Sequence, residues 1–64
     1  MKSEVIEAMK EFEGMDSITL LNELCDWAKD SARLQSAEER AEAYTNMCAI
    51  RNILKKRLKG GEEA

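Results

Sequence analysis

Glycine and proline, the residues that most often interrupt helices, are nearly absent from this sequence. Proline does not occur at all, and the only glycines are Gly14, Gly60 and Gly61. β-branched residues occur singly, and no stretch combines strand-like alternation with turn residues. The sequence therefore predicts an all-α fold in which the glycines mark the ends of helices.

The first helix is expected over about 4–13 and the second over about 17–34. Ser3 can cap the first helix, whose apolar residues recur at helical spacing: Val5, Ile6, Met9 and Phe12. Gly14 should end it, because glycine readily adopts the left-handed conformation that follows many helices. Asp16 or Ser17 begins the second helix. Its apolar residues form two adjoining rows: Ile18, Leu21, Cys25, Ala28 and Ala32 in one, and Leu20, Leu24, Trp27 and Leu34 in the other. A stripe this wide predicts more than one neighbour.

The third helix is expected over about 37–58. Ser36 and Glu39 have the spacing of a capping box, which predicts that the helix begins at Ala37. Its core stripe contains apolar residues at helical spacing: Ala43, Met47, Ile50, Leu54 and Leu58. The two adjacent glycines should end the helix and leave 60–64 as a frayed tail.

Only a short link separates the second and third helices, so they should lie side by side and antiparallel. In such a pair Leu24 would face Met47 and Leu21 would face Ile50, and both contacts would be apolar. The predicted fold is a short N-terminal helix followed by a long antiparallel helical hairpin. The sequence leaves open whether the N-terminal helix packs on its own hairpin, on a second subunit or on a target protein.

The chain has 64 residues and forms a single domain, 1–64. A chain this short buries only about 60 % of the surface that its unfolded form exposes, so it needs disulfides, a metal or subunit association. Cys25 and Cys48 are interpreted as buried free thiols, with a bridge or an intersubunit contact as alternatives. Histidine and CxxC spacing are absent, so no metal or cofactor is expected. Self-association remains, which predicts a homodimer or higher oligomer forming a helical bundle.

This layout resembles that of the small plasmid RNA-binding regulator Rop, a helical hairpin that dimerises into a four-helix bundle. The likeness lies in size and architecture, while the N-terminal helix departs from it. The resemblance implies an RNA-binding dimer as one alternative function, and no residue is carried over from it.

Charge is unevenly distributed along the chain. Residues 1–50 hold five basic and eleven acidic side chains, whereas 51–59 hold five basic and no acidic ones. The acidic body argues against general nucleic-acid binding and could block a basic site on a partner protein. No apolar run is long enough to span a membrane and the N-terminus does not resemble a signal peptide, so a cytoplasmic protein is expected.

The basic tip of the third helix is the first candidate site. It consists of cationic residues within two turns: Lys55, Lys56, Arg57 and Lys59. Cations near a helix C-terminus complement the helix dipole, and this structural role is the favoured interpretation. Binding to an acidic protein, or to a nucleic acid or nucleotide, is the alternative.

A second candidate site combines Arg40, Tyr44 and Arg51 on the third helix with Trp27 on the second. Salt bridges from the arginines to acids of the second helix are the favoured interpretation. Alternatively, these residues form half of a site for a planar anion at a subunit interface, since arginine binds phosphate bidentately and the aromatic ring stacks.

No histidine, activated nucleophile or glycine-rich loop indicates catalysis, so no enzymatic activity is expected. The hypothesis is that this chain is a small oligomeric binding protein, encoded by a phage or mobile element, that inhibits or adapts a partner protein. The alternatives are an oligomer that sequesters a nucleotide signal and the Rop-like RNA-binding dimer.

Overall fold

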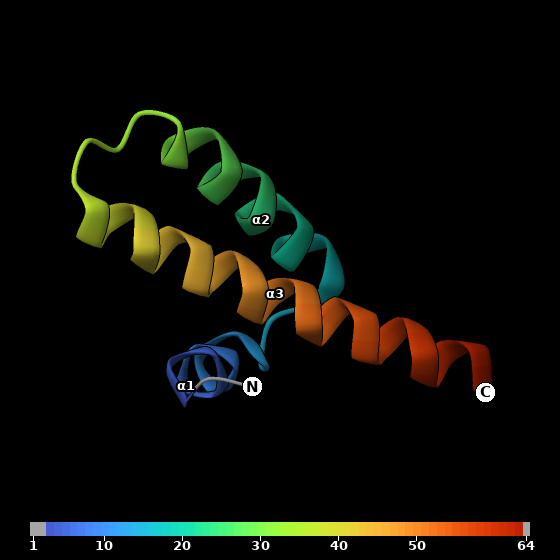
Figure 1. Ribbon diagram of the computed structural model, residues 1–64. Coiled ribbons are helices and arrows are strands. Elements are labelled where there is room, and N and C mark those ends of the chain that lie inside the picture. Colours follow the sequence, from blue (N-terminus) through green and yellow to red (C-terminus); the bar gives the residue numbers. More distant parts are fainter. Residues whose placement is uncertain (1–2, 64) are drawn as a thin grey trace.

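The computed structural model describes residues 3–63, with side chains through Gly60. Three helices account for almost all of this part: α1 (Ser3–Phe12), α2 (Ser17–Ser31) and α3 (Ala37–Glu63). Figure 1 shows α3 as the long central helix, with α2 on one side and α1 on another. The predicted all-helical class is confirmed. Residues 1, 2 and 64 of the expected domain lie outside the described residues.

The starts of α2 and α3 are fixed by side-chain caps. Asp16 is the N-cap of α2, and its carboxylate accepts hydrogen bonds from the Thr19 N–H at 3.3 Å and from the Thr19 hydroxyl. At α3 the Glu39 N–H donates to Ser36 Oγ at 3.0 Å. Each cap satisfies an N–H group that has no partner within its own helix. Both predicted helix starts, at Ser17 and Ala37, are therefore correct.

Two helix ends differ from the prediction. α2 ends at Ser31 and not near Leu34, in a turn where the Arg33 N–H donates to the Asp30 carbonyl. α3 continues through both glycines to Glu63, so the expected frayed tail over 60–64 is wrong as far as residue 63, and Ala64 lies outside the described residues.

A glycine can follow the end of a helix, but its presence does not cause the helix to end there. None of the described glycines has a positive φ, so Gly14 does not adopt the left-handed conformation that was expected of it. A glycine inside an exposed helix costs only about 1 kcal/mol relative to alanine. That cost is too small to stop a helix whose other residues favour it.

The core lies on two sides of α3. Its buried side chains come from all three helices: Val5, Ala8, Phe12, Leu20, Ala43, Ala49, Ile50 and Ile53. Met9, Met15, Leu24, Trp27 and Leu54 pack against this cluster and are half-buried. Because α1 contributes buried residues to the same cluster, the N-terminal helix packs on its own chain.

The expected core was too wide on α2 and too long on α3. On α2 only the row containing Leu20 faces the core, whereas Ile18 is 71% exposed and Leu21 is 51% exposed. The reason is that α1 packs on α3, so nothing covers the second row of α2 within the chain. Leu58 is 68% exposed because α3 extends beyond the start of α2. In its place Ala49 and Ile53 are buried in the core cluster that α1 shares.

Both cysteines are free thiols, and both are exposed. The expectation that they are buried is wrong, because Cys25 belongs to the uncovered row of α2 and Cys48 lies on a solvent-facing side of α3.

None of the three helices, over the residues that the structure describes, combines the length and apolar character that crossing a lipid bilayer requires.

The buried face of α3 can be tested by comparing two isoleucines. Ile50 is fully buried, whereas Ile6 is 43% exposed. Ile50→Ala should lower the free energy of unfolding by about 2–5 kcal/mol, because it removes apolar contacts and leaves a cavity. The matched control Ile6→Ala should lower it by less than half as much, because a large part of the Ile6 side chain is already in contact with water. Urea denaturation followed by circular dichroism measures both, and equal losses would contradict this core.

The cap of α2 predicts a dependence of stability on pH. The hydrogen bond from the Thr19 hydroxyl, followed by that from the Thr19 N–H, lowers the pKa of Asp16 below its ordinary value of 3.8. A lowered pKa stabilises the fold above the unfolded-state pKa, and this contribution is lost as the pH falls through the folded-state value. Asp16→Asn still caps the helix but cannot titrate. The melting temperature of the wild type minus that of this variant should therefore be constant near neutral pH. It should decrease as the pH falls through the folded-state pKa of Asp16.

Candidate functional site

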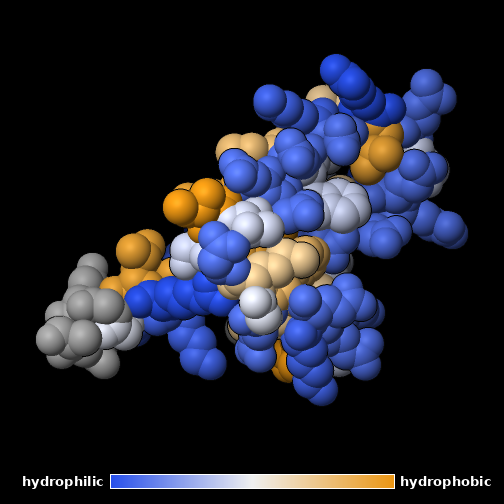
Figure 2. Space-filling view, turned by 180° about the vertical axis from the view of Figure 1, so that it is seen from behind, coloured by the Kyte–Doolittle hydropathy of each residue, from blue (hydrophilic) through white to orange (hydrophobic). Residues whose placement is uncertain are grey.

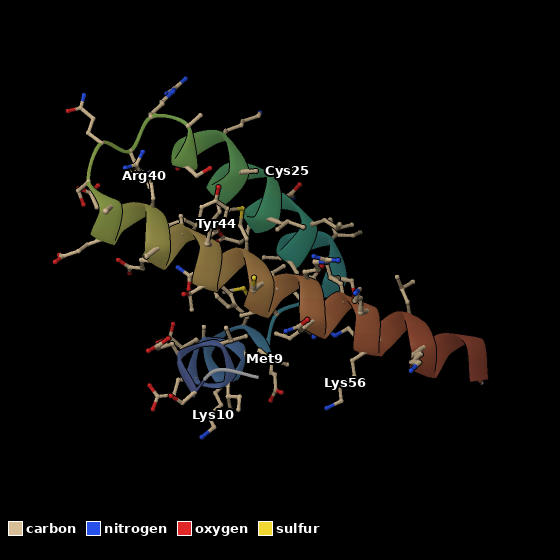
Figure 3. The ribbon with its side chains drawn as sticks, viewed as in Figure 1. Met9, Lys10, Cys25, Arg40, Tyr44 and Lys56 are labelled. Carbon is tan, nitrogen blue, oxygen red and sulfur yellow. The ribbon has the colours of Figure 1, made fainter. Side chains whose placement is uncertain are left out.

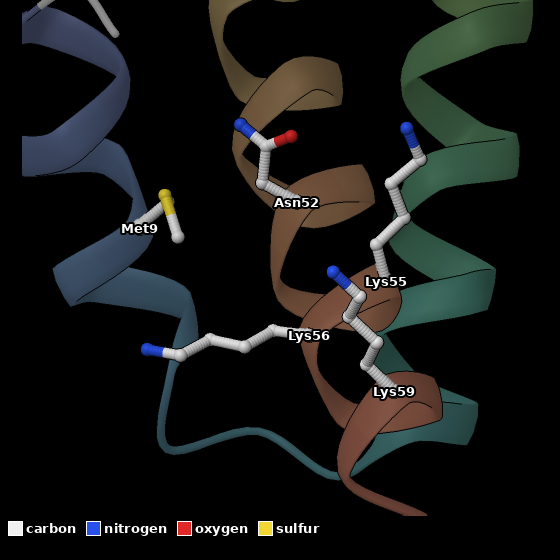
Figure 4. Close-up of a pocket in the computed structure, with 5 residues that line it drawn as sticks. All are labelled: Met9, Asn52, Lys55, Lys56 and Lys59. Atoms are coloured by element: carbon white, nitrogen blue, oxygen red, sulfur yellow. The ribbon is translucent and has the colours of Figure 1, made fainter. Parts of the chain in front are cut away.

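An open groove lies between α1 and the second half of α3. It has a volume of about 640 Å³ and is lined by Met9, Asn52, Lys55, Lys56 and Lys59. We call it the lysine groove. Figure 4 shows Met9 pointing from α1 toward α3, and Lys56 extending in the opposite direction toward α1. The three lysines are exposed, while Met9 and Asn52 are half-buried.

Helical spacing brings the α3 residues of the groove together. Lys55 and Lys59 are one turn apart, and Asn52 precedes Lys55 and Lys56 by three and four residues, so these side chains are neighbours on the helix surface. The sequence therefore contained the cationic half of this site as part of the basic tip. It did not indicate Met9, because that contact depends on how α1 docks.

Arg57, the remaining residue of the basic tip, does not line the groove. Its guanidinium donates to Ser17 Oγ at 3.1 Å, to the Glu13 carbonyl at 3.0 Å and to the Met15 carbonyl at 2.7 Å. The side chain is half-buried and fastens the connection between α1 and α2 to α3. We therefore assign Arg57 a structural role and remove it from the candidate binding residues.

The length of α3 argues against the favoured interpretation that Lys55 and Lys56 are present to complement the helix dipole. Because the helix continues to Glu63, its last turn contains no basic residue. The favourable interaction of cations with a helix dipole fades within the last turn. Lys55 and Lys56 lie farther from the end than that, so the helix dipole does not account for their presence.

The second predicted site is not assembled within one chain. Arg40, Tyr44 and Arg51 are exposed, whereas Trp27 is half-buried and packs against the core. Figure 3 shows Arg40 and Tyr44 following one another along the first half of α3. Tyr44 lines a separate hollow of about 370 Å³ together with Glu4, and neither arginine nor Trp27 lines it.

The expected salt bridges of the two arginines are also absent from the described part of the chain. Neither Arg40 nor Arg51 makes an ion pair there with Glu23, Asp26 or Asp30. Acids on α2 therefore do not neutralise these arginines.

Apolar side chains reach the surface in one row on α2 and one row on α3, and we call the two rows together the exposed apolar face. On α2 it consists of the uncovered row, whose spacing alternates between three and four residues: Ile18, Leu21, Cys25, Ala28 and Ala32. On α3 a row with the same alternation contains Arg40, Tyr44, Met47, Arg51, Leu54 and Leu58, of which Met47 and Leu54 are half-buried. Alternation of three and four is the heptad pattern with which one helix packs against another. Figure 2, the view from behind, shows that hydrophobic side chains reach the surface in several places among the polar ones.

No protein-family model, curated protein or solved structure matches this chain. Among the described residues, no group of three or more histidine, cysteine or acidic side chains could hold a metal ion. The lysine groove and the exposed apolar face are therefore the features on which a functional proposal can rest.

The role of Arg57 can be tested by removing its guanidinium. Arg57→Met keeps most of the apolar stem but loses the three hydrogen bonds, and we expect it to lower the free energy of unfolding by about 1–3 kcal/mol. Arg33→Met is the matched control, because Arg33 is exposed and its side chain makes no such bonds. Urea denaturation measures both. A loss no larger than that of Arg33→Met would show that Arg57 does not hold the connection.

Proposed function

We propose that this protein is a non-enzymatic binding protein that acts as an oligomer and inhibits or adapts a partner protein. In this proposal α2 and α3 form an antiparallel hairpin, and the exposed apolar faces of two copies pack against each other as a helical bundle. The observation that carries the proposal is a pair of heptad-spaced rows. The row on α2 lacks a cover within the chain, and the row on α3 leaves Tyr44 and Leu58 exposed although its Leu54 packs against the core.

Three large aliphatic residues of this face are exposed to water in the single chain. Ile18, Leu21 and Leu58 are between 51% and 71% exposed. Burying a leucine or isoleucine fully contributes roughly 1.5–3 kcal/mol, so each of these side chains can still gain a large part of that amount in an interface. A small domain with a marginal core gains stability from such an interface.

Two arginines interrupt the apolar character of the α3 row. Arg40 and Arg51 can lay their aliphatic stems along the neighbouring apolar residues while the guanidinium groups stay at the rim of the interface. Two copies would then bring like charges near each other. Salt screens such repulsion, so this self-association should strengthen as ionic strength rises. Binding of RNA or of a charged ligand would show the opposite dependence.

A nucleotide held between subunits is the second candidate function. Tyr44 is 62% exposed and stands between Arg40 and Arg51 on the proposed interface, so two copies could place stacking rings and guanidinium groups around one planar anion. Native mass spectrometry distinguishes the two functions. A bare dimer supports the protein-binding role, and an oligomer that retains a nucleotide-sized ligand supports this second one.

The interface can be tested with two neighbouring glutamate substitutions. Leu21→Glu places a charge in the exposed apolar face, and Asn22→Glu adds the same charge at an exposed position outside it. We expect Leu21→Glu to reduce the oligomer to a monomer while helical content is retained, and Asn22→Glu to keep the wild-type mass. Sedimentation equilibrium measures the mass. A wild-type monomer at micromolar concentration, or an unchanged mass for Leu21→Glu, would exclude this interface.

A further inference from the structure

Three lysines, Lys55, Lys56 and Lys59, line the lysine groove, and none of the residues that line it is acidic. The groove therefore presents positive charge to its surroundings, which attracts an anionic ligand. The helix dipole, the usual structural reason for such cations, does not reach Lys55 and Lys56. These lysines are therefore available to bind an anionic ligand.

The walls of the groove are apolar beneath the charges. Met9 contributes a flexible thioether, and each lysine contributes a four-carbon stem below its ammonium group. The groove thus combines an apolar floor with a cationic rim. A ligand that matches it carries an apolar group with carboxylates beside it.

The groove lacks the groups that usually recognise nucleotides. No aromatic side chain lines it, so a base has no ring on which to stack. No arginine lines it either, because Arg57 is held by the connection between α1 and α2. Lysine acts on phosphate as a point charge without the bidentate geometry of arginine. These features favour a carboxylate-bearing protein segment over a nucleotide.

The groove is also shaped before any ligand arrives. Its two walls are α1 and α3, which are packed together through buried residues such as Phe12 and Ile53. Arg57 fixes the chain just after α1 to α3. A preformed groove avoids part of the ordering cost of binding. Its volume of about 640 Å³ lies within the usual range of ligand sites, roughly 300–1,000 Å³.

We propose that the lysine groove binds an acidic segment of the partner protein, with an apolar side chain against Met9 and carboxylates on Lys55, Lys56 and Lys59. This inference rests on the proposed function as a binding protein, and it names the chemistry of the partner. It does not depend on self-association, because every residue of the groove comes from one chain.

The test uses the full-length protein and a short helical peptide in which glutamates flank leucines. Binding is followed by fluorescence anisotropy of the labelled peptide and by the NMR signal of the Met9 methyl group. We expect the peptide to bind and to shift the Met9 signal, and a second peptide with glutamine in place of glutamate to bind far more weakly. Three exposed ion pairs contribute roughly 0.2–1 kcal/mol each, so replacing all three lysines of the groove by glutamine should weaken binding about tenfold.

The matched control is the triple variant Lys10→Gln, Lys29→Gln and Arg33→Gln. It removes the same number of charges at exposed positions outside the groove, and Figure 3 shows Lys10 on α1 directed away from α3. We expect this variant to bind like the wild type. Sedimentation equilibrium on both triple variants shows whether self-association is intact, so a failure of the groove is distinguished from a failure of the oligomer.

Several results would overturn the proposal. They are an absence of binding at millimolar peptide, equal binding of the glutamine peptide, and an equal loss in the two triple variants. Inorganic tripolyphosphate that displaces the peptide and binds more tightly would assign the groove to a phosphate ligand instead.

Discussion

The guanidinium group of Arg57 joins the connection between α1 and α2 to α3. The arrangement of all three helices depends on these hydrogen bonds. The guanidinium donors reach the backbone carbonyls of Glu13 and Met15 and the hydroxyl of Ser17. The contact therefore holds the end of α1 and the start of α2 at one level of α3. It is a long-range contact of a charged group with carbonyls that no helix would otherwise satisfy, which makes it stronger than an exposed ion pair.

The surface of α3 falls into three parts: two that pack against the other helices and one that stays open. One part of its surface packs against α2 and another against α1, with Ile50 and Ile53 in the shared core, and the remaining surface stays open. The open surface carries both the lysine groove, at the edge of α1, and the heptad-spaced row that includes Tyr44 and Leu58. A small chain can therefore present two separate binding surfaces while burying few side chains, because a single long helix serves both.

Local patterns predicted the features that depend on residues close in sequence. The caps at Asp16 and Ser36 set the starts of α2 and α3 because each involves only the next three residues. The clustering of Lys55, Lys56 and Lys59 followed from helical spacing alone. Gly60 misled the prediction of where α3 ends, and Gly14 follows the end of α1 without the left-handed conformation expected of it, since glycine permits such an ending without requiring one.

The sequence by itself thus determined the helical class, the helix starts and the cationic half of the groove. Only the tertiary structure decided which apolar row of α2 is covered, since both rows satisfy the same periodicity and the choice depends on where α1 docks. It also decided that Arg57 supports the fold while the neighbouring lysines face a groove. The sequence does not distinguish the roles of these four neighbouring cations. The tertiary structure does, because it brings the carbonyls of the connection between α1 and α2 within hydrogen-bonding distance of Arg57 alone.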